Sequence, residues 1–184
     1  MARNLGVTTE TSKRMVLDAG VVYINYGETD ERILGATRAG SEFTVEQDIR
    51  EIEVDGNRGP TKGFRRVVEE HVRLNVNLLE MTAENIEIAL AGSSVTSGTE
   101  DVITRNLDIS AITYLTNVAL VADYSGDSGE PVVIVLKNAM ADGDFSLSAE
   151  DRDESTVSLQ FTGHFDPAGD LDESPFEIRF PTIA

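Results

Sequence analysis

The chain has 184 residues, two histidines and no cysteine, which suits a single domain and excludes disulfides, thiol nucleophiles and thiolate metal sites. Its formal net charge is −18, which argues against a protein that binds nucleic acid by neutralising phosphates. The longest apolar run, 132–136, is too short to span a membrane, so no membrane partner is expected.

The acidic charge is unevenly distributed along the chain. Residues 93–184 carry 17 acidic and 4 basic groups, whereas residues 1–92 carry 16 and 11. Only three basic residues are lysines. Dense carboxylates with few lysines favour a halophilic protein, because such a surface stays hydrated in concentrated salt. The alternative is an ordinary acidic protein that is kept soluble by its charge.

The first elements in chain order are an arm and two short strands. Residues 1–20 are mixed and polar, which favours an extended N-terminal arm. The β-branched and aromatic residues 21–26 predict a strand, and 33–37 predict a short strand or bend.

A long β-hairpin is predicted over residues 42–80. Apolar and polar residues alternate along both arms, 42–54 and 66–80, and the turn formers of 55–63 make its tip. The parity of the first arm changes between Ile49 and Ile52, which indicates a bulge near Arg50. The arms are well above the usual strand length of about five or six residues.

One short helix is predicted over residues 82–90, with Thr82 as its N-cap and Gly92 to end it. Residues 93–101 are expected to be a polar loop, and 166–184 a C-terminal arm. Further strands are predicted at 107–115, 118–124, 132–138, 145–147 and 157–165. The prediction is therefore a mainly β single domain, a β-sandwich or barrel-like fold with one flanking helix and two arms.

No coherent catalytic, cofactor or metal site is predicted. Gly126–Gly129 (GDSG) matches the core of a serine-protease motif, and His71 and Asp101 precede it in the appropriate order. The chain is too short for the two barrels of that family, so a hairpin turn is the expected role. The acidic clusters at 142–144, 150–154 and 166–173 do not fit a calcium-loop pattern and favour solvated loops over weak cation sites.

The hairpin tip is basic in an otherwise acidic chain. Arg58, Lys62, Arg65 and Arg66 lie within nine residues of one another. The tip is either a solvated turn or a docking element that meets carboxylates on a neighbouring copy. Long hairpins with exposed edges favour pairing with other chains, so self-assembly is the function that this pattern indicates.

Several segments in order resemble the major tail tube proteins of long-tailed, siphovirus-like viruses. The similarity extends from about residue 17 to 180. It is carried by residues 17–23 (LDAGVVY), 34–43 (LGATRAGSEF), 50–60 (REIEVDGNRGP), 77–85 (NLLEMTAEN), 135–139 (VLKNA) and 161–167 (FTGHFDP). Together with the charge, the resemblance points to a tailed virus of halophilic archaea, with a bacterial virus as the alternative.

The resemblance implies a structural virion protein that is not an enzyme and needs no cofactor. Six copies would close a ring by aligning their hairpins into an inner β-barrel, and stacked rings would form a hollow tail tube for ejection of double-stranded DNA. The implied partners are further copies, the tape measure, the tail terminator and the distal tail or baseplate proteins. Assembly would occur in the host cytoplasm.

The resemblance also implies roles for the hairpin residues. Stacking between rings would involve Asp55, Asn57, Arg58, Lys62, Arg65 and Arg66 at the tip. An acidic lumen, which offers DNA few cationic contacts, would be lined by Thr44, Glu46, Asp48, Glu51, Glu53, Glu69, His71, Arg73, Asn75 and Asn77. The alternatives are the tube of a contractile tail or secretion system, and a baseplate or decoration module.

Overall fold

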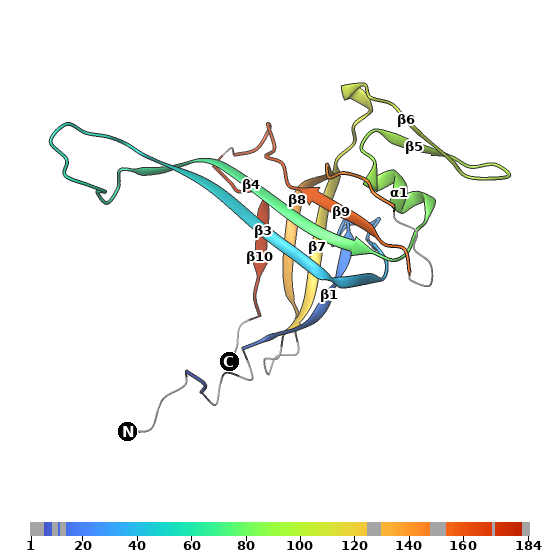
Figure 1. The fold of residues 1–184 in the computed structure, drawn as a ribbon, viewed down its shortest axis with the longest axis horizontal. Coiled ribbons are helices and arrows are strands. Elements are labelled where there is room, and N and C mark those ends of the chain that lie inside the picture. Colours follow the sequence, from blue (N-terminus) through green and yellow to red (C-terminus); the bar gives the residue numbers. More distant parts are fainter. Residues whose placement is uncertain are drawn as a thin grey trace.

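Two antiparallel β-layers enclose the hydrophobic core of the protein (Figure 1). The computed structural model describes residues 6–8, 11, 14–124, 130–147, 154–170 and 172–181. The first layer contains β1 (Val16–Ile24), β2 (Arg32–Ile33), β7 (Leu115–Tyr124), β8 (Val132–Ala141) and β10 (Phe176–Arg179). The second contains β3 (Thr37–Glu51), β4 (Arg65–Leu78) and β9 (Val157–Thr162). The expected mainly β fold with one short α-helix and a long hairpin is confirmed.

Strand β8 connects the two layers. Its residues Val133–Leu136 pair with β10, and Met140 and Ala141 pair with β9 on the same edge. Asn138 lies between the two pairings with a positive φ of 47°, a conformation that asparagine tolerates better than most residues. The overall strand order is β2-β1-β7-β8-β9-β4-β3, with β10 beside β8. The turn at Asn138 therefore lets one strand serve both layers.

The core follows from alternation along the strands. Val72, Leu74, Val76 and Leu78 of β4 are buried, whereas the residues between them are only half-buried. They belong to one cluster with buried side chains of β1, β7, β8 and β9, including the fully buried Phe161. The alternation predicted for residues 72–78 is confirmed. Burial on one face fixes the register of β4, because a shift by one residue would expose the apolar set.

The helix α1 (Ala83–Ala89) is held to the sandwich by a buried asparagine. Thr82 caps it by accepting a hydrogen bond from the Asn85 backbone, as predicted. The Asn85 side chain donates to the carbonyl oxygens of Leu34 at 2.9 Å and Glu80 at 3.2 Å, and it accepts from Arg32 at 3.0 Å. The amide therefore connects the helix to the β2 region and to the end of β4.

Two segments after the helix differ from the prediction. Residues 93–101, expected as a loop, begin the small hairpin of β5 (Ser93–Thr96) and β6 (Val102–Arg105). Residues 107–115, expected as a strand, contain the single-turn 3₁₀ helix η2 (Ile109–Ala111) instead. The reason is local, because the Asp108 side chain accepts the Ser110 backbone N–H and stabilises a turn.

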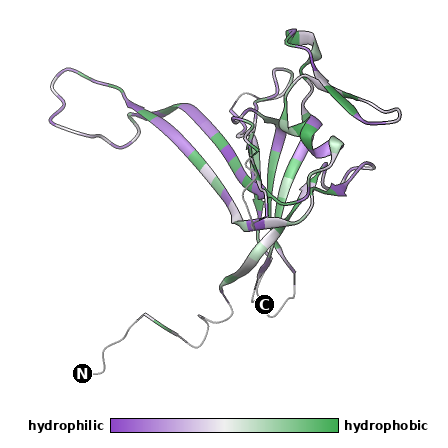
Figure 2. Ribbon diagram, turned by 45° about the vertical axis from the view of Figure 1, so that its right-hand side comes forward, coloured by the Kyte–Doolittle hydropathy of each residue, from purple (hydrophilic) through white to green (hydrophobic). Residues whose placement is uncertain are grey.

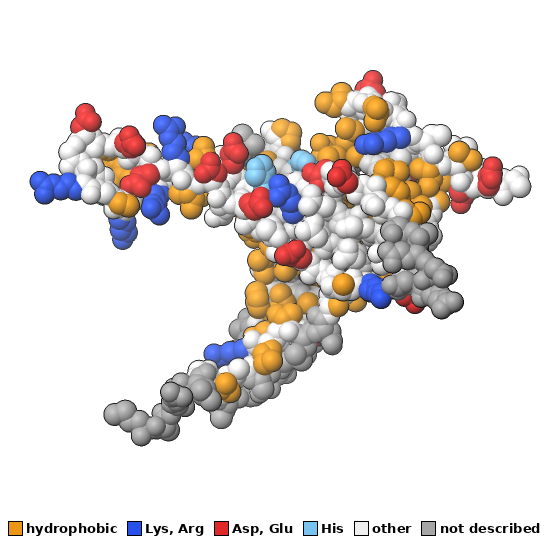
Figure 3. Space-filling model, viewed as in Figure 1, with side chains coloured by type: hydrophobic (Ala, Val, Ile, Leu, Met, Phe, Trp, Pro, Cys, Tyr) orange, Lys and Arg blue, Asp and Glu red, His pale blue; other side chains and the backbone are white. Residues whose placement is uncertain are grey.

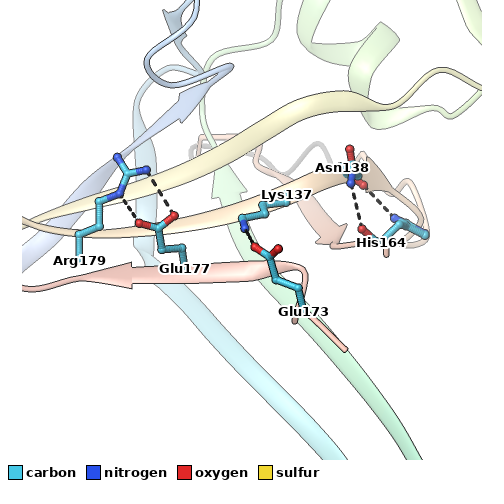
Figure 4. A network of polar contacts seen from close by, with 6 residues as sticks. All are labelled: Lys137, Asn138, His164, Glu173, Glu177 and Arg179. Atoms are coloured by element: carbon cyan, nitrogen blue, oxygen red, sulfur yellow. Dashed lines mark hydrogen bonds and ion pairs between the residues drawn. The ribbon is translucent and has the colours of Figure 1, made fainter. Parts of the chain in front are cut away.

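The C-terminal region is fastened to β8, although residues 166–184 were expected to form an arm. Figure 4 shows the contacts: Lys137 pairs with Glu173, and Asn138 and His164 exchange hydrogen bonds with each other's backbone.

Within β10, Arg179 donates to Glu177 at 2.8 Å, which lowers the pKa of that carboxyl and raises the pKa of the guanidinium. Residues 176–179 are therefore a strand of the first layer.

Other boundaries also differ from the prediction. Residues 16–20, assigned to the N-terminal arm, are part of β1, and residues 145–147 form only one isolated bridge, from Leu147 to Val157. The GDSG segment 126–129 and most of the acidic cluster 150–154 lie outside the described residues.

The Asn85 contacts can be tested by substitution. Asn85→Ala leaves the buried Leu34 carbonyl without its side-chain donor, so we expect a loss of roughly 2–4 kcal/mol in the free energy of unfolding. The exposed first-turn residue provides a control, and Glu84→Ala should cost below about 1 kcal/mol. Urea unfolding measures both, and equal losses in the two variants would contradict the anchoring role.

Candidate assembly interface

The hairpin of β3 and β4 extends well beyond the body of the protein (Figure 1). Its inner half is anchored, because Val72 and Leu74 are buried in the core and Phe43 and Val45 pack against it. From Glu46 outward along β3, every residue through Arg50 is exposed, as are Arg65–Glu69 of β4. The outer half is therefore a ribbon held only by its own cross-strand bonds and by its anchored base.

Both edges of this ribbon are open in the part of the chain that the structure describes. Strand β3 ends the sheet and pairs only with β4. Strand β4 pairs with β9 over Arg73–Leu78, and the Val72 carbonyl accepts one further bond from Gly163. Beyond it, the edge over Arg65–His71 has no described partner strand. Open strands with unpaired backbone groups are templates for pairing with another chain.

The direction of the β3 amides follows from two bonds at opposite ends of the ribbon. The Ile52 N–H donates to the Phe64 carbonyl at 2.7 Å, so even-numbered residues of β3 bond toward β4. Val72 lies opposite Val45 and directs its carbonyl away from β3, toward Gly163. Along an antiparallel strand, the backbone N–H and C=O groups of successive residues point alternately toward the partner strand and away from it. The N–H groups of Val45, Gln47 and Ile49 therefore point to the open edge.

One face of the hairpin carries most of the side chains that were predicted to face a lumen. This polar face holds Thr44, Glu46 and Asp48, opposite Arg73, His71 and Glu69, respectively. Arg73 and Glu46 form an ion pair at 2.7 Å, and His71 lies 3.7 Å from Glu69. Asn75 and Asn77 continue the face along β4, where Asn75 accepts a hydrogen bond from Gln160.

A bulge alters the composition of the polar face toward the tip. The register shifts so that Asp48 pairs with Glu69 and Ile49 pairs with Val67, which leaves Val68 as an extra residue in β4. The bulge expected near Arg50 of β3 is thus in the partner strand. As a result, β3 alternates without interruption, and Arg50 lies on the polar face.

Two acidic residues of the predicted lumen set, Glu51 and Glu53, lie apart from this polar face. Glu51 lies opposite Arg65, 3.8 Å from it, on the face that carries Ile49. Glu53 lies beyond the end of β3. The polar face instead gains Arg50 and Arg66, which are directly opposite each other. With Glu42, Glu46, Asp48 and Glu69 against Arg50, Arg66 and Arg73, the face is close to neutral rather than strongly acidic.

The tip is an exposed loop with its own hydrogen bonds. Asn57 bonds through its backbone to the Val54 carbonyl and through its side chain to Thr61. Gly56, Gly59 and Gly63 have positive φ values, which these turns require. The other tip residues predicted for stacking are exposed: Asp55, Arg58, Lys62, Arg65 and Arg66. Among the described residues, no ion pair involves Arg58, Lys62, Arg50 or Arg66.

Apolar side chains are exposed along the same projection. Figure 3 shows charges of both signs on the hairpin with apolar side chains between them. About half of each of these side chains is accessible: Ile49, Ile52, Val54, Val67 and Val68. Figure 2 shows that hydrophobic and hydrophilic residues alternate along β3 and β4 near the body, whereas the tip is more hydrophilic. Burial of these exposed apolar side chains by a partner would be energetically favourable.

The residues considered for catalysis or metal binding are dispersed. His71 is exposed on β4, and Asp101 precedes β6 on a different part of the chain. The described residues include no group of three or more His, Cys, Asp or Glu side chains placed to hold a metal ion. The acidic stretch 166–173 uses Asp166 and Asp170 as acceptors in tight turns. No described helix is long and apolar enough to cross a membrane.

No protein-family model and no curated protein matches the chain. Similar solved structures include a chain in the virion of a native gene transfer agent particle (8% identity, TM-score 0.47, covering 80% of this chain and 92% of that one). Another is in the tail of an empty gene transfer agent particle with C6 symmetry (9%, 0.48, 89% and 96%). A third is in the sixfold-symmetrised baseplate of the anti-feeding prophage (11%, 0.47, 80% and 89%). Identities and TM-scores this low leave the function to be argued from the geometry of the chain itself.

The edge geometry makes a prediction for amide hydrogen exchange in the unassembled protein. The N–H groups of Glu46 and Asp48 bond to β4 and should exchange slowly, whereas those of Gln47 and Ile49 point outward and should exchange fast. Residue-resolved NMR on protein held at low concentration measures this alternation. Equal protection at odd and even positions would show that the assigned register or edge is wrong.

Proposed function

We propose that the chain is the structural subunit of the tail tube of a long-tailed virus, in which hexameric rings stack into a hollow conduit for DNA. The observation that carries the proposal is the projecting hairpin with two open edges. The ordered sequence resemblance supplies the sixfold ring and the tail as context. The virion tail is accordingly its proposed location, and tape measure, terminator and baseplate proteins are its proposed partners.

The two edges suit one another for closing a ring. The β3 edge of one copy can extend the sheet of the next copy by pairing antiparallel with its open β4 edge over Arg65–His71. Because β3 and β4 run in opposite directions, repetition of this step gives an up-and-down wall. A contact between two different surfaces is heterologous, and it produces a closed ring when its rotation divides a full turn.

The faces of the hairpin suit the inside and outside of such a wall. Phe43 and Val45 pack toward the core of their own copy, so the polar face points away from the body. We assign that face to the lumen, with Thr44, Glu46, Asp48, Glu69, His71, Arg73, Asn75 and Asn77 in it. Among the Asp, Glu, Lys and Arg residues of this set, Glu46, Asp48 and Glu69 outnumber Arg73, and the Arg73 guanidinium is paired with Glu46. DNA would therefore meet little net attraction to the wall.

The negative charge of the whole chain belongs mainly to other surfaces. Residues 93–184 hold most of the excess carboxylates, with 17 acidic and 4 basic groups. We assign this charge to the tube exterior, where it keeps the particle soluble in concentrated salt. This part of the proposal corresponds to a virus of a halophilic host.

A proline at the open edge tests the ring directly. Gln47→Pro removes an N–H that points away from β4, so the hairpin itself should tolerate it while pairing with the next copy is lost. We expect folded monomers in place of rings, with at least about a tenfold fall in assembled protein in sedimentation velocity experiments.

The control for this variant is Gln47→Ala. It removes the same side chain and its hydrogen bond to Glu70 but keeps the backbone N–H. Assembly of the alanine variant should match that of the wild type. Normal rings from Gln47→Pro would overturn edge pairing through β3.

Charge reversal at the tip tests stacking separately. Arg58 and Lys62 are exposed, and neither has a described ion-pair partner in its own copy. Arg58→Glu combined with Lys62→Glu should leave single rings intact and shorten or abolish tubes, because the opposing acidic surface would then repel the tip. Electron microscopy distinguishes the two species, and tubes of normal length would remove these residues from the stacking contact.

A further inference from the structure

The turn that follows β6 displays the two most exposed large apolar side chains among the described residues. Leu107 is 79% and Ile109 is 85% accessible, and Asp108 lies between them. We refer to residues Asn106–Ala111 as the knob. Exposed leucine and isoleucine side chains on a short projection favour burial against a partner.

The knob is a rigid structure rather than a loose loop. Asn106 accepts the Asp108 N–H at 3.0 Å, and the Asp108 carboxylate accepts the Ser110 N–H at 2.9 Å and its hydroxyl at 2.7 Å. These hydrogen bonds from Ser110 lower the pKa of Asp108, so its carboxylate stays negatively charged to a lower pH than an ordinary aspartate. A preorganised projection loses little conformational entropy when it docks.

A glycine fixes the knob to the body of the protein. The Asn106 N–H donates to the Gly92 carbonyl at 2.8 Å, and Arg105 donates to the Ala91 carbonyl at 2.9 Å. Gly92 has a φ of +77°, and a Cβ there would lie 2.4 Å from the Asn106 carbonyl oxygen. The close approach therefore requires glycine, and it holds the base of the knob in place.

A groove of complementary character lies at the bulge of the hairpin. It is lined by Arg50, Ile52, Arg66, Val67 and Val68 and encloses about 330 Å³. The three apolar side chains are about half exposed. The two arginines are direct cross-strand neighbours, an arrangement of like charges that is unfavourable without an anion between them. Neither has an ion-pair partner among the described residues.

The knob and the groove lie far apart in the molecule. Figures 1 and 2 both place the turn after β6 far from the outer end of the hairpin. A knob therefore cannot reach the groove of its own copy. The apolar floor favours a protein segment over a phosphate backbone, which would leave Ile52 and Val68 uncovered.

We propose that the knob of one copy docks in the hairpin groove of a copy in the adjacent ring. The Asp108 carboxylate lies between Arg50 and Arg66, and Leu107 and Ile109 cover Ile52 and Val68. This inference rests on the proposed ring and identifies the surface that receives the hairpin. The bulge at Val68 favours such a contact, because bulges add local twist and turn the outer ribbon away from the direction of the inner polar face.

The test compares charge reversals in the full chain. Asp108→Arg should leave rings intact and reduce tubes at least about tenfold, because it places a third cation between two arginines. Combining it with Arg66→Asp should restore a large part of the stacking, since the opposite charges are then exchanged. The effect should be larger in dilute than in molar salt if wild-type tubes persist in both.

Two further variants separate charge from fold. Asp108→Asn keeps an acceptor for Ser110 but loses the negative charge, so it should weaken stacking while its thermal unfolding stays close to wild type. Asp101→Arg makes the same charge change at an exposed site before β6 and should leave stacking unchanged. Leu107→Ser with Ile109→Ser should also reduce tubes, which reports the apolar part of the contact.

The outcomes distinguish this inference from the function on which it rests. If wild-type protein gives tubes and Asp108→Arg gives tubes of equal length, the knob contact is wrong and the tube proposal stands. If wild-type protein forms no hollow particle in any salt, the tube proposal itself fails. Rescue by the exchanged charges would establish the pairing between knob and groove, because no structural defect at Asp108 predicts it.

Discussion

The structure depends on one constraint on the hairpin of β3 and β4: its inner half is packed in the hydrophobic core, and its outer half is exposed to solvent. The inner part of the hairpin is fixed by buried side chains such as Val72 and Leu74, so its outer part projects in a defined direction. The outer part retains unpaired backbone edges and exposed apolar side chains. Open strand edges of this kind are templates for pairing with other chains.

The rest of the fold supports the base of this projection. Strand β9 pairs with the inner half of β4, and β8 joins β9 to the first layer through the turn at Asn138. The C-terminal strand β10 then occupies the remaining edge of β8. These pairings occupy the strand edges in the middle of the sheet. The open strand edges are therefore those of the hairpin and of the short outer strands. The location of the proposed interface therefore follows from the strand order.

The sequence predicted the elements whose signals are local. The alternation of residues 72–78 and the Thr82 cap identified the inner hairpin and the helix, because both patterns depend on nearby residues. The position of the bulge was not predictable, since the extra residue Val68 is defined only by pairing with the other strand. Most of the knob lies within residues 107–115, which were predicted as a strand. Its structure is decided by side-chain bonds within the turn and by contact with Gly92.

Electron microscopy of the purified protein, in molar salt and in dilute buffer, would show whether copies join through the open edges of the hairpin. We expect hollow particles with sixfold end views, in which the β3 edge of each copy adjoins β4 of the next. Ring formation that depends on molar salt would further support the halophilic assignment. Compact monomers in both conditions, or particles in which the β3 edge stays in contact with solvent, would contradict ring closure through the hairpin edges.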